Sequence, residues 1–298
     1  MNIGEAYDLF LADKGADGVA EKTIESYRNV FKSLCRYLDD ELEISDVTDR
    51  TIKTAVNKLA GTGVSPNTVR SHTATMKSFF SWCREEGLCD VKIALYKGVE
   101  TIPETYSREE LEKLLKQPNL RSCGFVEYRS WVIVNLLVNN GLRAGSIRAI
   151  QNRDVSLEKG AIFLRHTKTR KILTIPLSSS MTAILARYMR TRGGKPEDYL
   201  FCEDTGEQLT EIALRRSIER YNRSRGVKKT GLHKFRHTFA RMYITEIGGN
   251  AFKLQKLLGH STLAMTRHYA AIYDQDLLGG YDDESPLELF HPKKIRMK

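Results

Sequence analysis

Apolar and polar positions follow a helical period through the first part of the chain. Between Thr23 and Asp39 the apolar residues fall three or four positions apart, which places them on one face of a helix. The segments Glu5–Lys14 and Thr51–Ala60 show the same spacing, and Gly61 follows the last of them. The pattern therefore predicts three helices before a glycine stop.

A longer helix is predicted from Ser65 to about Glu86. Pro66 occupies a position that the first turn of a helix tolerates, and Gly87 stands just past the end. The apolar residues expected to face a core are Val69, Met76, Phe79, Phe80 and Cys83. A second face, with basic residues seven positions apart, carries Arg70, Lys77 and Arg84. This stripe suits contacts with phosphates or a solvated helix face, and spacing alone leaves both interpretations open.

Periodicity weakens from Cys89 to Thr105, a stretch that contains a glycine and a proline. We interpret it as the connection between two domains, with the linker itself at 99–106. Ser107 then opens a helix, and Glu110 three positions later completes a capping box. The expected organisation is a helical domain at 1–98, a second domain at 107–279 and a tail at 280–298.

The second part mixes helices with a short stretch of strand character. Ala161–Leu164 and Ile172–Ile175 are apolar runs that flank the basic segment His166–Lys171, as expected of a β-hairpin or a small sheet with a basic tip. Helical periodicity predicts the other elements at Phe125–Asn139, Arg143–Ile150, Ser179–Arg192, Thr210–Arg225 and Leu232–Glu246, with further short helices to about Leu278. We therefore expect a mainly α fold with a small antiparallel sheet.

Composition indicates a globular protein with room for two domains. Of the 298 residues, 41% are hydrophobic and 28% are charged. The chain contains no apolar run long enough for a membrane span, and its start lacks the features of a secretion signal. The five cysteines are odd in number and never form a CxxC pair, which favours reduced cytoplasmic thiols over disulfides or a zinc site.

The charge is unevenly distributed along the chain. Residues 1–49 hold 5 Lys or Arg and 12 Asp or Glu, a net of −7. Residues 50–98 have a net of +5, from 8 basic and 3 acidic residues, and residues 99–298 a net of +12, from 34 basic and 22 acidic residues. A polyanion partner such as nucleic acid would explain this concentration of basic charge, and a generally basic, solvated surface is the alternative.

Two segments of the second part place basic residues and histidines at helix ends and on a helix face. Asn140–Ser146 (NGLRAGS) puts Arg143 just after the helix stop at Gly141, where the end of a helix exposes side chains. Leu232–Ala240 (LHKFRHTFA) puts His233 and Arg236 three positions apart, and hence on one face of a helix.

A third segment, Leu257–Ser261 (LLGHS), is followed by Arg267-His-Tyr269. Its Gly259 breaks the preceding helix, so that His260 points outward. Taken singly, these residues fit structural roles: a surface arginine, a turn histidine and a buried aromatic side chain. Their occurrence together, in this order and in one basic half of the chain, favours a shared site.

A zinc site is one alternative, since His233 and His237 have the i,i+4 spacing of a metal-binding helix. The metalloprotease pattern requires Glu at position 234, where this chain has Lys234, and Arg236 adds positive charge where a dication would bind. Motifs for a serine nucleophile elbow, a phosphate-binding GxxxxGK[ST] loop or a dinucleotide are absent from the sequence. We expect neither a metal nor a cofactor.

Phosphoryl-transfer chemistry fits these residues better. Two arginines, a lysine and two histidines are hydrogen-bond donors, and planar guanidinium groups match the oxygens of a phosphodiester under attack. A phenol ionises near a pH of about 10, so a tyrosine nucleophile requires a cationic site or a nearby base. The segments together supply both.

These segments resemble the motifs of the tyrosine recombinases, the family of the phage integrases and of the Xer and Cre recombinases. The resemblance is close from about Ser107 to Tyr269 and looser in the first part, mainly over 65–87. The motifs that carry it are GLR at 141–143, HKFRHTFA at 233–240 and LLGHSTLAMTRHYA at 257–270, with a basic hairpin between the first two. The resemblance implies a helical core-DNA-binding domain and an α+β catalytic domain that form a C-shaped clamp on DNA.

By this resemblance, Arg143 and Arg236 would bind the non-bridging oxygens of the scissile phosphate. His233 would assist proton transfer, and His260 would hydrogen-bond the phosphate. One departure is Ser146, which stands where the family usually has an acidic residue, and it puts in doubt the usual support of Arg143 or His233. A second is the acidic segment 1–49, because the family's first domain is usually basic.

The nucleophile implied by the resemblance is Tyr269, and its spacing from the histidine of LLGH favours it over Tyr273. Lys168 on the basic hairpin would be the acid for the leaving 5′-hydroxyl, with Arg170 and Lys171 as neighbouring alternatives. The resemblance implies cleavage through a 3′-phosphotyrosine, without ATP or Mg²⁺.

The implied function is site-specific recombination, for integration or excision of a mobile element. The motif at 281–287 and the sequence Arg267-His268-Tyr269 favour that role. The alternatives are an Xer-like resolvase of chromosome or plasmid dimers, a DNA-binding regulator that does not cut, and a relaxing enzyme like the type IB topoisomerases.

The implied partners are double-stranded DNA and further copies of the chain, as a homo-tetramer on paired sites, with a monomer in the absence of DNA left open. For base reading we favour the predicted helix Thr210–Arg225, whose basic face carries Arg216, Arg220 and Arg223. Phosphate contact fits the same residues. The tail, with Leu287, Leu289 and Phe290, would dock onto a neighbouring subunit or remain disordered.

Overall fold

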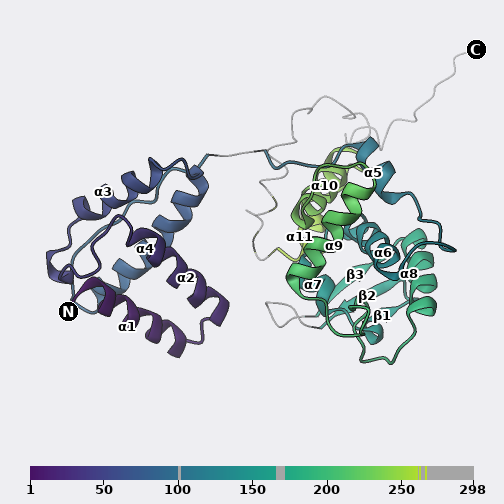
Figure 1. Cartoon of the computed structure of the whole chain (residues 1–298), viewed down its shortest axis with the longest axis horizontal. Coiled ribbons are helices and arrows are strands. Elements are labelled where there is room, and N and C mark those ends of the chain that lie inside the picture. Colours follow the sequence, from purple (N-terminus) through teal and green to yellow (C-terminus); the bar gives the residue numbers. More distant parts are fainter. Residues whose placement is uncertain (100–101, 166–171, 261, 263–265, 267–298) are drawn as a thin grey trace, which may run out of the picture. The chain divides into compact units, whose positions relative to one another are not determined.

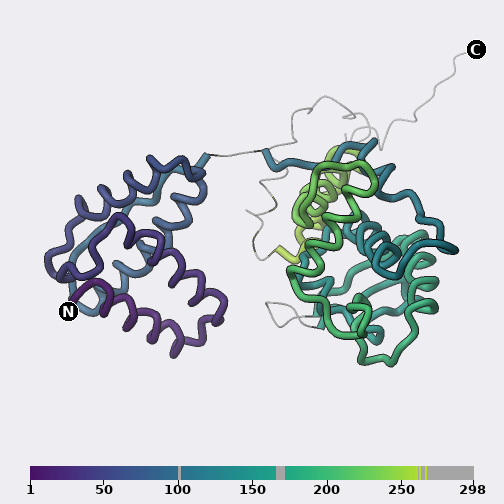
Figure 2. Tube along the Cα trace, viewed as in Figure 1, coloured from purple at the N-terminus to yellow at the C-terminus, as the bar shows by residue number. Residues whose placement is uncertain are grey.

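The computed structural model describes residues 1–99, 102–165, 172–260, 262 and 266. Lys168, Tyr269 and the tail predicted at 280–298 lie outside the described residues, as do the short helices expected between residues 267 and 278. Contacts divide the chain into two compact units, Met1–Thr101 and Ile102–Lys298. Each unit is described by itself (Figures 1 and 2).

The first unit is helical. Its elements are α1 (Ile3–Ala16), α2 (Glu21–Leu34), a 3-10 turn η1 (Ile44–Asp46), α3 (Asp49–Ala60) and α4 (Pro66–Glu85). The Ser65 hydroxyl accepts a hydrogen bond from the Thr68 amide at 3.1 Å and so caps α4. Helix α2 ends at Leu34, earlier than its apolar pattern predicts. The chain continues in turns, in which the Tyr37 and Leu38 amides donate to the Leu34 carbonyl. Leu38 is still buried, which explains why it fits the apolar pattern.

Aromatic side chains fill the core of the first unit. The Tyr7 ring stacks on Phe31 with a centroid distance of 4.0 Å and meets Phe79 edge-on at 4.8 Å. Such pairs add about 0.5–1.5 kcal/mol each beyond the burial of their area. The five residues of α4 predicted to face the core are all buried, so the amphipathic pattern correctly oriented this helix.

The segment after α4 folds back onto the first unit. Gly87 adopts a left-handed conformation with φ of 70°, and the Leu88 amide donates to the Cys83 carbonyl at 2.8 Å. Val91 is buried in the first core, whereas Tyr106 is buried in the second. The stretch from Cys89 to Thr105, interpreted from its weak periodicity as a connection, therefore contributes to a core at its beginning.

The second unit surrounds helix α6 (Phe125–Asn140), which contacts α5, α8, α9 and α10. Its Val132, Ile133 and Leu136 have no exposed surface, which explains why the helix is apolar on almost every side. The other helical elements are α5 (Arg108–Leu115), α7 (Ala144–Ala149), η2 (Asn152–Asp154), α8 (Ser179–Arg192), α9 (Glu211–Ser224), α10 (Leu232–Thr245) and α11 (Ala251–Leu258).

A three-stranded antiparallel sheet lies at one end of the second unit (Figure 1). Strand β2 (Ala161–Leu164) pairs with β3 (Leu173–Pro176) in a register that sets Leu164 opposite Leu173. This confirms the predicted hairpin. The third strand, β1 (Val155–Ser156), is too short to show a periodicity in the sequence.

Two further expectations concern the cysteines and membranes. All five cysteines are free, and Cys83 and Cys202 are buried. Among the described residues, no helix has both the length and the apolar character needed to cross a membrane.

Candidate active site

Two helices of the second unit end on left-handed glycines that bring the candidate residues into position. Helix α6 ends at Gly141, with φ of 60°, and Arg143 then stands at the N-cap position of α7. Helix α11 ends at Gly259, with φ of 61°. A Cβ atom at Gly141 would lie 2.8 Å from the Phe239 ring. Glycine is therefore required there both by the backbone conformation and by the close packing of α10.

The Arg236 side chain joins these two helix ends. It lies on α10 and is only 3% exposed. Its Nη1 donates to the Gly141 carbonyl and its Nη2 to the Leu258 carbonyl, both at 2.9 Å. Since the guanidinium is a rigid fork of donors, two fixed acceptors determine its orientation.

Arg143 also donates to the end of α11. Its Nη1 donates to the carbonyls of Leu258 and Gly259, each at 3.3 Å. The Leu258 oxygen thus accepts from both arginines, which sets two guanidinium groups next to each other. These acceptors are neutral, so the bonds orient the cations without cancelling their charge. Arg143 is exposed, whereas Arg236 is buried.

His260 lies beside this pair and is 8% exposed. Its amide donates to the Gln255 carbonyl at 3.1 Å, and its carbonyl accepts from Gln255 Nε2 at 3.3 Å. Its Nδ1 lies 2.9 Å from Thr266 Oγ1. Burial, with the charges of Arg236 and Arg143, lowers the pKa of His260 to about 4. The ring is therefore neutral at physiological pH.

His233 lies one turn before Arg236 on α10 and is exposed. Partial desolvation, and then the charges of Arg236 and Arg143, lower the pKa of His233 below its ordinary value. Both arginines therefore act electrostatically on both histidines. Arg143, His233, Arg236 and His260 thus form one cluster. Sequence spacing alone had not established this convergence.

His237, the second member of the i,i+4 pair, has its ring edge-on to that of His233, with centroids 4.9 Å apart. Among the described residues, no group of three His, Cys, Asp or Glu side chains is placed to hold a metal ion.

The sheet borders the cluster. A Cβ atom at Gly259 would lie 3.2 Å from a methyl group of Leu173, at the start of β3. Leu173 pairs with Leu164, so these ends of β2 and β3 lie next to the site. Lys168 itself and Tyr269 lie outside the described residues.

Ser146 occupies the position where the sequence comparison led us to expect an acidic residue. It lies on α7 and is partly buried. Main-chain carbonyls hold both guanidinium groups here, and they provide a support for the arginines that does not depend on a carboxylate at position 146.

The predicted DNA-binding residues fall into two different environments. On α4, Arg84 donates to the Val91 carbonyl at 2.6 Å and to Ser81 Oγ at 2.9 Å, while Lys77 is exposed. Arg70 donates to the Tyr96 carbonyl at 3.5 Å. Part of the predicted basic stripe is thus bound to the segment that follows α4.

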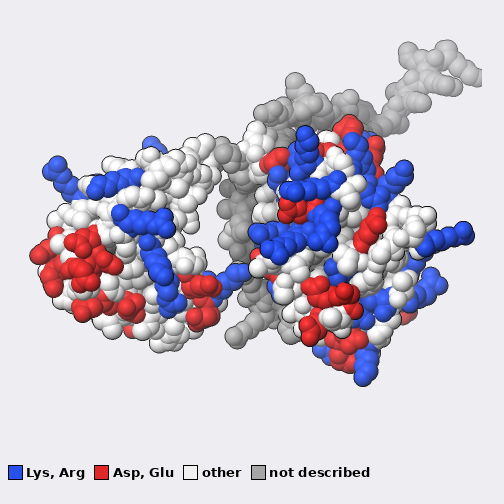
Figure 3. Space-filling model, in the orientation of Figure 1, with Lys and Arg blue, Asp and Glu red and all other residues white. Residues whose placement is uncertain are grey.

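The basic face of α9 is open by comparison. Arg216, Arg220 and Arg223 are all exposed, and Arg223 forms an ion pair with Glu219 at 2.7 Å. Figure 3 shows lysine and arginine side chains gathered over the region of α9. In the first unit, the same view shows acidic side chains gathered on the side of the amino terminus.

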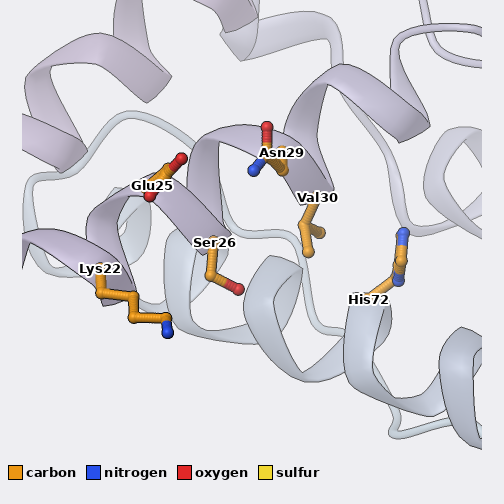
Figure 4. A pocket seen from close by; sticks show the side chains of 6 residues that line it. All are labelled: Lys22, Glu25, Ser26, Asn29, Val30 and His72. Carbon is orange, nitrogen blue, oxygen red and sulfur yellow. The ribbon is translucent and has the colours of Figure 1, made fainter. Parts of the chain in front are cut away.

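A separate hollow of about 350 Å³ lies in the first unit between α2 and α4 (Figure 4). Its lining residues are Lys22, Glu25, Ser26, Asn29, Val30 and His72. None of the predicted catalytic residues lines it.

Three features of the site were not foreseen from the sequence: the shared Leu258 carbonyl, the Gln255 bonds to His260, and the contact with Thr266. Every residue has a main-chain carbonyl, so residue types do not show which carbonyl accepts a hydrogen bond. Thr266 lies six residues from His260, a separation that does not place two residues on one face of a helix.

Comparison with known proteins covers both units. A model of the phage integrase family matches residues 104–276, and a model of the phage integrase N-terminal SAM-like domain matches residues 7–87. Tyrosine recombinase XerC of Thermodesulfovibrio yellowstonii is 26% identical over 283 residues, which cover 91% of this chain and 92% of the relative.

Solved structures show the same fold. A lambda integrase (75–356) dimer bound to a COC′ core site has a TM-score of 0.72 at 21% identity, and covers 89% of this chain and 97% of that chain. A lambda integrase tetramer bound to a Holliday junction has a TM-score of 0.70 at 22% identity, and covers 88% of this chain and 78% of that chain.

The chain belongs to the phage integrase family of tyrosine recombinases. It is accordingly a site-specific recombinase, an enzyme that breaks and rejoins DNA.

Proposed function

We propose that this chain cleaves DNA through Tyr269, and that Arg143, His233, Arg236 and His260 bind and activate the scissile phosphate. The observation that carries the proposal is the convergence of both guanidinium groups on the Leu258 carbonyl, beside two histidines whose pKa values they lower. Oriented cationic forks next to neutral imidazoles suit a phosphodiester whose oxygens gain charge during attack.

The proposed reaction is a transesterification in two steps. The Tyr269 oxygen forms a bond to phosphorus, the bond from phosphorus to the 5′-oxygen breaks, and a 3′-phosphotyrosyl ester results. His233, whose pKa is lowered by desolvation and by the two arginines, accepts the phenol proton, and Lys168 gives a proton to the leaving 5′-oxygen. A 5′-hydroxyl of a partner strand then attacks the ester and releases Tyr269. Each ester formed replaces one broken, so no nucleotide is consumed.

The nucleophile is proposed to come from the same chain as the cluster. Thr266 Oγ1 lies 2.9 Å from His260 Nδ1, and Tyr269 follows Thr266 by three residues, a stretch that spans at most about 11 Å. A stretch of this length allows Tyr269 to reach the cluster of its own chain.

DNA is proposed to bind with α9 facing a groove and with α4 contributing phosphate contacts, Lys77 foremost. The helical domain at 1–98, the linker at 99–106 and the catalytic domain at 107–279 would act as a clamp, with a homo-tetramer on paired sites. Support for the tetramer comes from the similarity to lambda integrase, which has been solved as a tetramer on a Holliday junction.

For the biological role we propose integration or excision of a mobile element. The similarity to XerC over 91% of this chain favours resolution of chromosome or plasmid dimers as the second candidate. The DNA that flanks the gene separates the two, because inverted repeats at the ends of a mobile element would nominate the target site of an integrase.

Covalent capture on a nicked duplex tests the chemistry. The nick lets the cleaved end diffuse away, so the protein–DNA ester accumulates. We expect Tyr269→Phe to abolish the denaturant-resistant adduct without weakening binding, and Tyr273→Phe to retain it. Capture by Tyr269→Phe would refute the assignment. Binding by the wild-type chain without any adduct would favour a regulator, and relaxation without site preference would favour a topoisomerase-like enzyme.

A further inference from the structure

The Nδ1 atom of His260 contacts Thr266, whose side chain is fully buried. Thr266 Oγ1 lies 2.9 Å from His260 Nδ1. The backbone of His260 is fixed independently, because Gln255 accepts from its amide and donates to its carbonyl. With the backbone and Nδ1 both held, the ring plane and the direction of Nε2 are set.

A neutral histidine exists in two tautomers, in which the donor and acceptor nitrogens are exchanged. Because His260 is neutral at physiological pH, only one ring nitrogen carries a proton. If Nε2 carries it, the ring donates a hydrogen bond to a phosphate oxygen. If Nδ1 carries it, Nε2 presents a lone pair that would repel the same oxygen. The partner of Nδ1 decides between the two forms.

The Thr266 hydroxyl can in principle either donate to Nδ1 or accept from it. Within the described part of the chain, His260 Nδ1 is the one hydrogen-bond partner of this hydroxyl. If the hydroxyl accepted from Nδ1, its own proton would be buried without an acceptor, which costs about 1–3 kcal/mol. Donation from Thr266 to Nδ1 avoids this cost and leaves the histidine proton on Nε2.

We propose that Thr266 is a positioning residue that holds His260 in the Nε2-protonated form, so that the ring donates to the scissile phosphate. This inference rests on the proposed function. Thr266 also stands three residues before Tyr269 in the sequence. The hydrogen bond therefore links the phosphate-binding histidine to the segment that carries the nucleophile.

The first test observes the unaltered His260 ring and uses a substitution only to assign its signal. Nitrogen NMR of the chain labelled at its histidine rings distinguishes a protonated from an unprotonated Nδ1. With His260→Gln used to assign the signal, we expect His260 to show an unprotonated Nδ1 and a protonated Nε2 at pH 7.5. The reverse pattern would overturn the proposal.

The second test is kinetic and uses a matched pair of variants. Thr266→Val keeps the shape but removes the hydroxyl, and Thr266→Ser restores it. We expect Thr266→Val to slow single-turnover cleavage of the nicked duplex by about 10–100-fold, less than the roughly 10²–10³-fold cost of removing one transition-state donor. Thr266→Ser should stay within a few-fold of wild type, and DNA affinity should be unchanged in both.

A double-mutant cycle shows whether Thr266 acts through His260. In a His260→Gln background, Thr266→Val should cost almost nothing further, since the ring that it orients is absent. Full additivity would refute the positioning role. These results are distinct from a failure of the proposed function, because that failure would appear as covalent capture by Tyr269→Phe, whereas wild-type cleavage rates in Thr266→Val would overturn only this inference.

Discussion

Arginines of α4 and of the cluster around Arg143 and Arg236 make the same kind of hydrogen bond in two different settings. In the first unit, Arg84 donates to the carbonyl of Val91, in the segment that directly follows its own helix. In the second unit, Arg143 donates to Leu258, 115 positions further along the chain, and Arg236 shares that acceptor. A bond to a carbonyl fixes a guanidinium in both places. Only in the second do fixed cations from separate segments meet each other and two histidines.

The largest effect is expected from removing either arginine of the cluster. Arg143→Ala and Arg236→Ala should each slow single-turnover cleavage by about 10³–10⁵-fold, the value of an arginine at a phosphoryl transition state. Their stabilities should differ, because Arg236 is buried with two bonds and Arg143 is exposed.

Thermal unfolding checks that difference. Arg236→Ala should lower the free energy of unfolding by about 3 kcal/mol, from two lost charged hydrogen bonds, and Arg143→Ala by less than about 1 kcal/mol. Equal losses of stability would contradict the separate placements of the two side chains. Arg236→Lys is the matched control, since it keeps the charge without the fork.

The next effect concerns the first unit. Arg84→Ala should lower the free energy of unfolding by about 1.5–3 kcal/mol, because a charged donor to Val91 and Ser81 is lost. The neighbouring Lys77→Ala, at an exposed site, should stay within about 0.5 kcal/mol of wild type. Chemical denaturation measures both, and a wild-type stability of Arg84→Ala would show that Arg84 is unimportant for folding.

A pH effect should distinguish the second unit. Because the folded pKa of His260 is lowered to about 4, the unfolded chain takes up a proton between that value and the ordinary value of about 6.5, while the folded chain does not. The stability should therefore fall as the pH falls through this range.

At pH 5 the loss from His260 should reach about 2 kcal/mol relative to pH 7.5, at 1.36 kcal/mol per unit of pKa difference. The lowered pKa of His233 acts in the same direction. Denaturant titrations at several pH values measure the slope, and His260→Gln should reduce it. An unchanged slope in that variant would show that His260 is not held neutral by the arginines.

The smallest effect is expected on α9. Arg216→Ala, at an exposed position, should lower the salt dependence of DNA binding by about 0.9 in the logarithmic slope if it contacts one phosphate. A base contact would instead relax sequence preference by about 1–3 kcal/mol at one position. Arg223→Ala should change less, because Glu219 already pairs with Arg223. Binding isotherms across salt concentrations separate these outcomes.

Local signals predicted the elements better than the environments. Ser65-Pro66 and Gly87 marked the ends of α4, and the capping box at Ser107 and Glu110 is present. Helical spacing also showed that Arg70, Lys77 and Arg84 share a face. Spacing contains no information about what covers a face, so the return of the segment around Val91 onto α4 was not predicted.

The same limit applies to the site. Residue types pointed to Arg143, His233, Arg236 and His260, because few chemistries use such a set. Main-chain carbonyls from α6 and α11 orient the arginines, and a carbonyl is present at every residue. Tertiary packing decides which carbonyls face a side chain. That packing depends on Gly141 and Gly259, whose left-handed conformation the sequence suggests but does not determine.

The most direct measurement of the central claim is peptide mapping of the covalent protein–DNA complex. After trapping on a nicked duplex and digestion with protease and nuclease, mass spectrometry locates the residue that keeps a 3′-linked nucleotide. The account predicts the adduct on the Tyr269 phenol oxygen of the chain whose Arg143 and Arg236 bind the phosphate. An adduct on any other side chain would contradict it.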